Sequence, residues 1–283
     1  MKTDNKFKWK LYVKEDSPKG DITSLAIFPK NTQKIRTRFI AKEDCVLSGW
    51  QEVQGFLKAQ FPSLKLQIKK QNASAARRGQ TIAVLTGPVV QVLEAERTCL
   101  NLLQQLSGVA TLTQVFVKKA KPHKVAILDT RKTVPGYREE QKLAVTHGGG
   151  QNHRFNLSDQ YLIKDNHIDA AGSISAALKA VYAHKKKHKL RARVEIEVRD
   201  QKEFTEALAL KPDIILLDNM TPAQIKKLVL LREQAGLRKK VLLEVSGGVT
   251  LKTIDRYLPL GIDRISLGCL THSARAVDIS LLF

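Results

Sequence analysis

The chain has 283 residues and a mass of 31.7 kDa, with 43% apolar and 27% charged residues. This apolar content excludes an intrinsically disordered chain, and the 16 glycines and three cysteines exclude a collagen-like or disulfide-built fold. The formal net charge of +21 is large, and it requires an anionic partner, an anionic substrate or an unusually basic surface.

Short strands and helices mix in the first hundred or so residues. The first twenty residues are charged and hold no apolar stretch, so we expect no signal peptide. Residues 35–41 alternate like a half-buried strand, and residues 82–85 predict a second strand, closed by a Gly-Pro turn at 87–88. Residues 89–117 predict a long helical stretch, in which Gly108 marks a break between two helices.

From residue 124 onward, short apolar runs alternate with helical patterns. Continuous apolar strands that alternate with helices predict a parallel sheet buried on both faces. Thr221 and Pro222 support one helix start, since threonine caps a helix and proline suits its first position. The predicted strands are 125–128, 161–163, 194–198, 214–217, 241–245 and 265–267, and the predicted helices are 173–187, 202–210, 221–234 and 250–258.

Each predicted strand of this region carries or leads into polar or glycine residues. Such groups at the carboxyl ends of successive parallel strands are typical of an α/β-barrel active site. An open doubly wound sheet would bind its ligand only at the switch point, so six contributing strands favour the barrel. The residues concerned are Asp129, Arg131, Lys132, Lys164, Asp165, Glu195, Glu197, Asp218, Asn219, Glu244, Ser246 and Gly268.

Glycines follow the last two predicted strands. Ser246, Gly247 and Gly248 lie between a strand and a helix, where backbone N–H groups can approach an anion. Gly268 repeats the arrangement, with His272 close behind it. Such glycines can simply make tight turns, but barrels often bind phosphate at these two loops, so the pair predicts a phosphate site.

Five cations lie on or beside the predicted strand ends: Arg131, Lys132, His153, Arg154 and Lys164. A single one could be a solvated side chain, but five at one barrel mouth indicate a polyanionic substrate, because arginine can grip a carboxylate or phosphate with two hydrogen bonds. Two acids, Glu197 and Asp218, end neighbouring strands. They could bind ribose hydroxyls, hold Mg²⁺ or stabilise a cationic transition state, or equally form structural ion pairs.

Other classes of protein fit the sequence less well. The cations are spread along the chain, and the densest cluster, residues 185–189, suits a solvated helix end better than a nucleic-acid site. Walker, dinucleotide-binding, zinc-protease and serine-hydrolase motifs are absent. The three distant cysteines indicate a reducing compartment, and no apolar run reaches the roughly 18 residues of a membrane span. We therefore expect a cytoplasmic protein that binds neither nucleic acid nor membrane.

A set of motifs, in order along nearly the whole chain, resembles the quinolinate phosphoribosyltransferase family. Each string alone is weak, but together they are highly specific. They are GDIT at 20–23, ERTCLNLLQQLSGVATLT at 96–113, LDTRKTVPGYR at 128–138, GGGQNHR at 148–154, LIKDNHI at 162–168, LLDNM at 216–220, SGGV at 246–249 and GCLTHS at 268–273.

The resemblance implies an α/β subunit with an incomplete, about seven-stranded α/β barrel and a smaller N-terminal α/β domain. The small domain would cover residues 1–110, with the tail 273–283 packed on it, and the barrel would cover 111–272. Family members are homodimers or larger homo-oligomers, in which the neighbour's N-terminal domain covers the barrel mouth. The implied reaction joins quinolinate to phosphoribosyl pyrophosphate with Mg²⁺, and yields nicotinate mononucleotide, pyrophosphate and CO₂ in de novo NAD synthesis.

The resemblance also implies roles for individual residues. The quinolinate pocket would consist of Arg131, His153, Arg154 and Lys164, with Arg97 reaching the neighbouring site across the dimer. Phosphoribosyl pyrophosphate would contact Lys132, Glu197, Asp218, Ser246, Gly247, Gly248, Gly268 and His272. The catalytic residues would be Lys132, Lys164, Glu197 and Asp218, and the two acids would share Mg²⁺ with the substrate phosphates.

Three positions depart from the family pattern without touching these roles. Asn156 stands where a glycine is usual, and Val245 and Cys99 replace small residues. The nearest rival is the paralogous family associated with molybdenum transport, which shares the fold but differs in the quinolinate pocket. The intact motifs at 148–154 and 162–168 favour the quinolinate enzyme, and they argue against a degenerate, non-catalytic homologue.

Overall fold

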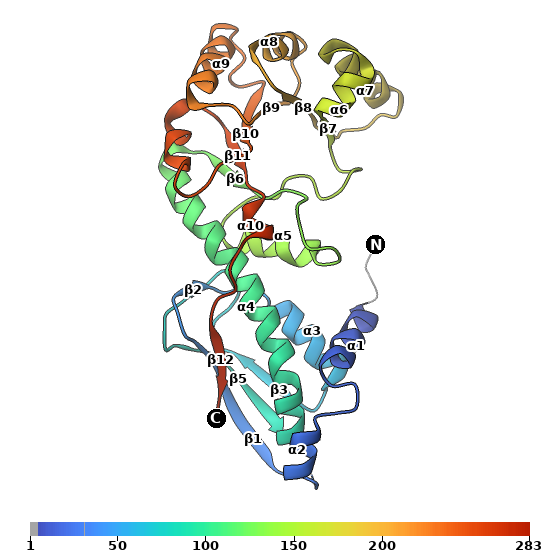
Figure 1. Cartoon of the computed structure of the whole chain (residues 1–283), viewed down its shortest axis with the longest axis vertical. Coiled ribbons are helices and arrows are strands. Elements are labelled where there is room, and N and C mark those ends of the chain that lie inside the picture. The colour runs from blue at the N-terminus through green and yellow to red at the C-terminus, as the bar shows by residue number, and fades with distance from the viewer. Residues whose placement is uncertain (1–4, 31) are drawn as a thin grey trace. The chain divides into compact units, whose positions relative to one another are not determined.

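The computed structural model describes residues 5–30 and 32–283, which form two compact units (Figure 1). The first unit comprises Met1–Gln114, Pro135–Gly149 and Ser273–Phe283, and the second comprises Val115–Val134 and Gly150–His272. The segment Pro135–Gly149 thus belongs to the first unit, although the predicted boundaries leave it in the barrel. The division into domains at residues 110 and 272 stays a prediction.

The first unit is built on an antiparallel sheet with the strand order β12-β1-β5-β3. These strands are β12 (Ile279–Leu282), β1 (Lys34–Ala41), β5 (Thr81–Pro88) and β3 (Lys65–Ile68), and the two-residue strands β2 (Cys45–Val46) and β4 (Ala75–Ala76) pair separately. Its helices are α1 (Asn5–Asp16), α2 (Ile22–Ile27), α3 (Trp50–Gln60), α5 (Arg138–His147) and most of α4 (Val89–Ala120).

The core of the first unit follows from its amphipathic elements. In β1 every second residue from Thr37 onward is buried, which confirms the predicted half-buried strand. Phe39 of this strand packs edge to face on Trp50 of α3 at 6.0 Å between ring centroids, and both side chains are almost fully buried. The indole of Trp50 donates to the carbonyl of Lys70 at 2.8 Å, so its one polar atom is satisfied inside the core.

Two predictions for this unit are wrong, and both concern glycines. Helix α4 runs unbroken for 32 residues through Gly108. A Cβ at Gly108 would lie 2.1 Å from the carbonyl oxygen of Arg275, so this glycine serves close backbone packing rather than a break. The predicted turn at 87–88 is the end of β5, and a Cβ at Gly87 would lie 2.4 Å from the side chain of Leu64.

The second unit contains a six-stranded parallel sheet with the order β6-β11-β10-β9-β8-β7. All six predicted strands are confirmed within one residue at each end. In β8 all five residues are buried, as a sheet covered on both faces requires. The strands are β6 (Ala126–Leu128), β7 (Tyr161–Ile163), β8 (Val194–Val198), β9 (Ile214–Asp218), β10 (Leu242–Ser246) and β11 (Arg264–Ser266).

The fold class is the predicted mixed α/β type, with a separate antiparallel sheet near the N-terminus. Where about seven barrel strands were expected, the described residues form six, and a single parallel bridge between Leu128 and Gln151 lies beside β6. The helices of the second unit are α6 (Asp165–Ala171), α7 (Ile174–Lys187), α8 (Gln201–Ala209), α9 (Pro222–Gln234) and α10 (Cys269–His272), with the 3₁₀ turn η1 (Lys121–His123).

Helix starts follow the local signals, with one exception. Ser173 and Asp200 cap α7 and α8, and Thr221 forms a capping box with Gln224 at α9. The predicted helix at 250–258 is wrong, because this region holds a turn and the short 3₁₀ turns η2 (Ile254–Arg256) and η3 (Leu258–Leu260). Proline within η3 cannot donate to a continuing helix, and it ends the pattern.

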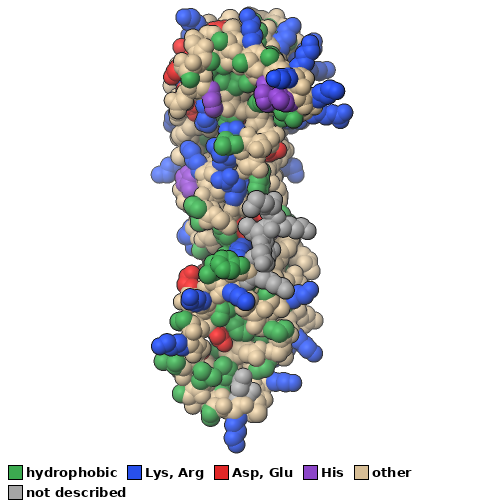
Figure 2. All heavy atoms as spheres, turned by 90° about the vertical axis from the view of Figure 1, so that its right-hand side faces the viewer, with side chains coloured by type: hydrophobic (Ala, Val, Ile, Leu, Met, Phe, Trp, Pro, Cys, Tyr) green, Lys and Arg blue, Asp and Glu red, His purple; other side chains and the backbone are tan. Residues whose placement is uncertain are grey.

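The surface is strongly basic. Figure 2 shows Lys and Arg side chains spread over the visible face, with far fewer Asp and Glu. Among the described residues, no helix combines the length and apolar character needed to cross a bilayer. The basic character of the visible face comes from dispersed Lys and Arg side chains. The cations predicted to bind substrate belong to the second unit.

Candidate active site

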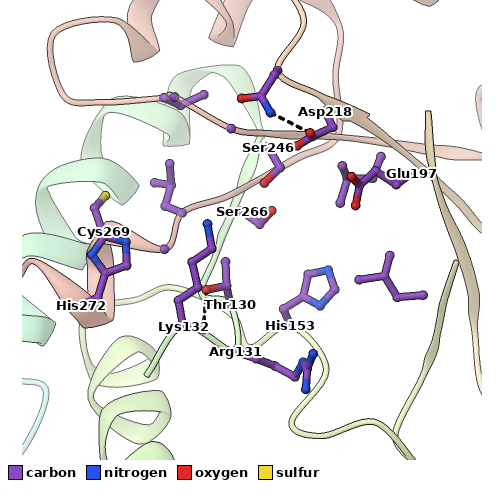
Figure 3. A pocket seen from close by; sticks show the side chains of 18 of the residues that line it. Thr130, Arg131, Lys132, His153, Glu197, Asp218, Ser246, Ser266, Cys269 and His272 are labelled. Atoms are coloured by element: carbon purple, nitrogen blue, oxygen red, sulfur yellow. Dashed lines mark hydrogen bonds between the residues drawn. The ribbon is translucent and has the colours of Figure 1, made fainter. Parts of the chain in front are cut away.

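A cavity of about 710 Å³ lies at the carboxyl ends of the parallel strands of the second unit (Figure 3). Residues at or just beyond all six strand ends line it, which is the arrangement of barrel active sites. Its lining comprises Thr130, Arg131, Lys132, His153, Arg154, Leu162, Lys164, Glu197, Leu216, Asp218, Asn219, Ser246, Gly247, Gly248, Val249, Thr250, Ser266, Leu267, Gly268, Cys269 and His272.

The loop after β6 brings Arg131 and Lys132 to the cavity. The hydroxyl of Thr130 accepts a hydrogen bond from the amide of Lys132 at 3.0 Å, which shapes the turn. The carbonyl of Lys132 accepts from the Thr271 hydroxyl at 2.7 Å, so this loop is tied to helix α10. Lys132 is thereby held beside Gly268, where a Cβ would lie 3.0 Å from the Lys132 side chain.

The segment after the Gln151 bridge supplies His153 and Arg154. The His153 amide donates to the buried carboxylate of Asp129 at 2.8 Å, which joins this segment to the end of β6. Arg154 is only 6% exposed, and its guanidinium donates to the carbonyl of Gln160 at 3.3 Å. Burial and the repulsion of nearby Arg131 lower the pKa of Arg154. Two guanidinium groups therefore lie near each other in a partly dry site, where an anion between them is favoured.

Lys164 and Glu197 form an ion pair across β7 and β8. The Lys164 ammonium lies 3.1 Å from a carboxylate oxygen of Glu197. Burial raises the pKa of Glu197, Lys164 opposes this shift, and the nearby Asp218 adds to it. Glu197 and Asp218 thus repel each other across neighbouring strands, and a cation between them would relieve that repulsion.

Asn219 fixes the second of these acids. It adopts a left-handed backbone with φ of 52°, and its side-chain amide donates to Asp218 at 2.7 Å. Its amide oxygen lies against Gly247, where a Cβ would meet it at 2.1 Å. Gly247 and Gly248 themselves have φ of 89° and 62°, so the SGG loop needs glycine for its backbone as well as for space.

The cavity brings together every predicted site residue except Arg97. Arg97 is exposed on α4 in the first unit, and its predicted role across a dimer stays a prediction. The roles assigned to the others also stay predictions, although their meeting at one cavity is what those roles require. Sequence reasoning did not select Thr130, Thr250, Ser266 and Cys269, which also line the cavity, and it placed Asn219 at a strand end without giving it a role.

Signals for some of the missed residues were present. Ser266 ends β11 as Ser246 ends β10, and the role of Asn219 could have been sought from its place directly after Asp218 in the LLDNM motif. Asn156, which departs from the family pattern, accepts a hydrogen bond from the amide of Ser158 at 2.8 Å and has no positive φ. Its backbone conformation does not require glycine, so the substitution leaves this turn unstrained.

Comparisons with known proteins agree with the cavity. The chain matches the family model "Quinolinate phosphoribosyl transferase, N-terminal domain" over residues 21–107 and the corresponding C-terminal domain over residues 109–282. It is 37% identical to the probable carboxylating nicotinate-nucleotide pyrophosphorylase of Bacillus subtilis, over 94% of this chain and 89% of that protein. It is also 37% identical to the chloroplastic enzyme of that name from Arabidopsis thaliana, over 96% and 80% of the two chains.

Solved structures give the same result. The nicotinate-nucleotide pyrophosphorylase of Francisella tularensis matches with a TM-score of 0.89 and 36% identity, covering 98% of this chain and 95% of that one. The NadC protein of Streptococcus pyogenes matches with a TM-score of 0.89 and 35% identity, over the same shares of the two chains. Two domain matches in sequence order, similar relatives along nearly the full length and a cavity lined by the motif residues therefore agree. The chain belongs to the quinolinate phosphoribosyltransferase family.

Proposed function

We propose that this protein is a quinolinate phosphoribosyltransferase, a glycosyltransferase of NAD biosynthesis that converts quinolinate and phosphoribosyl pyrophosphate into nicotinate mononucleotide, pyrophosphate and CO₂. One observation carries the proposal above all. A single cavity combines adjacent guanidinium groups, Arg131 and Arg154, with a glycine-rich anion loop and two carboxylates. These are the groups that a dianionic ring, a phosphorylated sugar and a developing ribosyl cation require.

Quinolinate binding falls to the cationic side of the cavity. Its two carboxylates neutralise Arg131 and Arg154, and each guanidinium can donate two parallel hydrogen bonds to a carboxylate. Lys164, which projects from the end of β7, adds a point charge. Held at several points, the ring presents its nitrogen to the ribose carbon in a fixed orientation, and this removes much of the entropic cost of the reaction.

Phosphoribosyl pyrophosphate binding falls to the loops after β10 and β11. Gly247 and Gly248 both have positive φ, and in this conformation successive backbone N–H groups would face an anion. On the neighbouring loop, after β11, Lys132 and His272 both lie close to Gly268. These groups would hold the two phosphorylated ends of the substrate across the cavity.

Glu197 and Asp218 suit the charge that develops at the ribose. As the bond to pyrophosphate breaks, the ribose carbon becomes oxocarbenium-like, and two nearby carboxylates stabilise it. Their mutual repulsion also fits a site for Mg²⁺, which is usually bound by one or two carboxylates together with substrate phosphates. Bound there, Mg²⁺ would neutralise charge on the leaving pyrophosphate.

The decarboxylation needs no further group from the protein. The ring nitrogen donates its electron pair to the ribose carbon, and pyrophosphate leaves with the electrons of the broken bond. The cationic ring then accepts the electrons released when the adjacent carboxylate departs as CO₂, and that ring carbon takes up a proton from water. The protein contributes orientation: Arg131 and Arg154 hold the two carboxylates of quinolinate in place until one of them leaves as CO₂.

A turnover assay with purified protein, quinolinate, phosphoribosyl pyrophosphate and Mg²⁺ tests the function directly, with nicotinate mononucleotide followed by chromatography. We expect product only when all three are added. A folded protein that makes no product from quinolinate, but acts on another acceptor, would overturn the proposal in favour of the molybdenum-associated family.

We further propose a homodimer or larger assembly in which Arg97 completes the neighbouring site. The test is subunit complementation between Arg97→Ala and Lys164→Ala, each nearly inactive alone. Randomly mixed dimers would contain one intact site in half of the molecules, which restores about a quarter of wild-type activity. No recovery after subunit exchange would mean that Arg97 acts within its own chain or not at all.

The cytoplasmic location stays a prediction, and one plant relative is named chloroplastic.

A further inference from the structure

A second row of charged side chains lies beneath the cavity. Side chains two residues apart on a strand share a face, so Glu195 lies below Glu197 on β8, and Glu244 lies below Ser246 on β10. Arg264 of β11 is the register partner of Glu244. Glu195 and Glu244 are fully buried, in a position where a carboxylate requires compensating partners.

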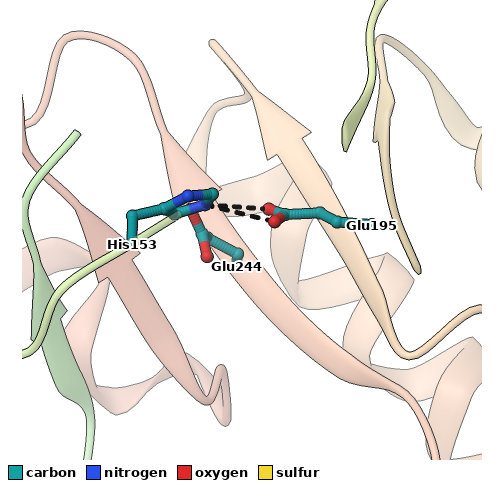
Figure 4. A group of neighbouring side chains, drawn as sticks. All are labelled: His153, Glu195 and Glu244. Carbon is teal, nitrogen blue, oxygen red and sulfur yellow. Dashed lines mark hydrogen bonds and ion pairs between the residues drawn. The ribbon is translucent and has the colours of Figure 1, made fainter. Parts of the chain in front are cut away.

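His153 is a partner of both carboxylates (Figure 4). Its Nε2 lies 3.1 Å from a carboxylate oxygen of Glu195 and 3.2 Å from Oε1 of Glu244. The other oxygen of Glu244 lies 3.0 Å from Nε of Arg264, and Gln160 donates to Glu195. The imidazole therefore joins two strands that are separated in the sheet by β9.

The other ring nitrogen determines which tautomer the neutral imidazole adopts. Nδ1 of His153 accepts a hydrogen bond from the backbone amide of Arg154 at 2.8 Å. The proton of a neutral ring must then be on Nε2, where it faces the two carboxylates. Three groups that could hold a metal ion thus lie within 4.8 Å of one another, but Nε2 has no lone pair to offer one. The cluster is a hydrogen-bonding unit and not a metal site.

We propose that Glu195 and Glu244 are positioning residues of the quinolinate pocket, which hold His153 and, through its Nδ1, the backbone of Arg154. This inference rests on the proposed function for the identity of the ligand. The two carboxylates hold the imidazole in one orientation and one tautomer. The imidazole in turn holds the backbone amide of Arg154, and this positions the Arg154 side chain. Glu195 also favours the charged form of Arg154 electrostatically. The anion pocket is in this way organised before substrate arrives.

Steady-state kinetics of Glu195→Gln and Glu244→Gln test the proposal. Both variants keep the side-chain size and remove the carboxylate that receives the Nε2 proton. We expect the KM for quinolinate to rise about 10–100-fold, as for a lost hydrogen bond to a charged group, and the KM for phosphoribosyl pyrophosphate to stay within about twofold. Equal increases in both KM values, or no increase in either, would overturn the proposal.

Arg232→Met is the matched control. Arg232 is buried in the same unit and ion-paired with Asp263, but it contacts carbonyls at the amino ends of β10 and β11, away from the cavity. We expect Arg232→Met to destabilise the fold, because the Asp263 carboxylate loses its buried ion-pair partner. We expect the ratio of the two KM values to stay unchanged. A purely structural role of the glutamates would make them behave like this control.

A spectroscopic measurement on the wild-type protein tests the proposal without turnover. It applies even if the glutamine variants do not fold. Burial lowers the pKa of His153, but its hydrogen bonds to Glu195 and Glu244 outweigh this and raise the pKa to about 9, so the spectrum is recorded above that pH, where the ring is neutral. In the ¹⁵N spectrum of imidazole-labelled wild-type protein, we then expect the His153 signal, assigned by its loss in His153→Gln, to show a protonated Nε2 and an unprotonated Nδ1. A protonated Nδ1 would overturn the positioning arrangement even if the enzyme is active. The expected tautomer in a protein that does not convert quinolinate would refute the proposed function alone.

Discussion

Replacing Arg131 by alanine should weaken the binding of quinolinate far more than the binding of phosphoribosyl pyrophosphate. Arg131 lies beside Arg154 on the side assigned to quinolinate, whereas the glycine loop at 246–248 lies across the cavity on β10. A hydrogen bond to a charged group contributes about 1.5–3 kcal/mol. Loss of a bidentate contact is partly offset, because Arg154 is released from the repulsion that lowers its pKa. A net loss of about 2 kcal/mol corresponds to about 30-fold weaker binding of quinolinate.

Titration calorimetry with each substrate alone measures this effect. The affinity for phosphoribosyl pyrophosphate should change less than about twofold, and Arg131→Lys should lie between wild type and alanine, because lysine keeps the charge but loses the planar fork. Arg199→Ala is the control, since Arg199 is an exposed, ion-paired arginine of the same unit outside the cavity. Unchanged quinolinate affinity in Arg131→Ala, or equal weakening of both substrates, would refute the reasoning.

Three further predictions test the loops, the core and the pH dependence. Gly247→Ala should weaken phosphoribosyl pyrophosphate binding more than tenfold in calorimetry, because the new Cβ would overlap the Asn219 amide at 2.1 Å, whereas Gly248→Ala meets open space and should cost only the backbone strain of about 1–2 kcal/mol in urea unfolding. Gly108→Ala should lower the free energy of unfolding by about 2 kcal/mol, because its Cβ would lie 2.1 Å from a backbone carbonyl; a gain of about 1 kcal/mol, as in an open helix, would contradict this. Burial lowers the pKa of His147 below 6.5, so the unfolded state binds more protons, and the stability from the neutral ring is lost as the pH falls from about 6.5 through the folded pKa. His147→Gln should flatten this part of the profile of urea midpoints between pH 5 and 8, and an unchanged slope would show that the ring does not carry it.

The local elements were largely predictable from the sequence. Parallel strands buried on both faces appear as short apolar runs, and this is why all six strands of the second unit were located. The cap at Thr221 has a direct signal in its neighbours. The wrong predictions at Gly108 and Gly87 share one cause. At each position a segment distant in the sequence packs so closely that there is no room for a side chain.

The site was predictable in its visible layer. Residues at strand carboxyl ends meet at one edge of a parallel sheet, so Glu197, Asp218 and Ser246 could be grouped without coordinates. The layer beneath them could not. Glu195 and Glu244 were visible as charges within strands, but their partner His153 comes from a loop, and no spacing in the sequence relates it to them.

The fold class, the family and the charged residues and glycines of the cavity can be read from the sequence, because apolar periodicity and motif order are local properties of the chain. The side chains that hold these residues in place are known only from the folded structure. Packing chooses such partners across long separations: the carboxylates that receive the His153 proton, the amide that orients Asp218 and the backbone that excludes a side chain at Gly108. Such contacts depend on distances of a few ångströms between segments, which no local pattern records.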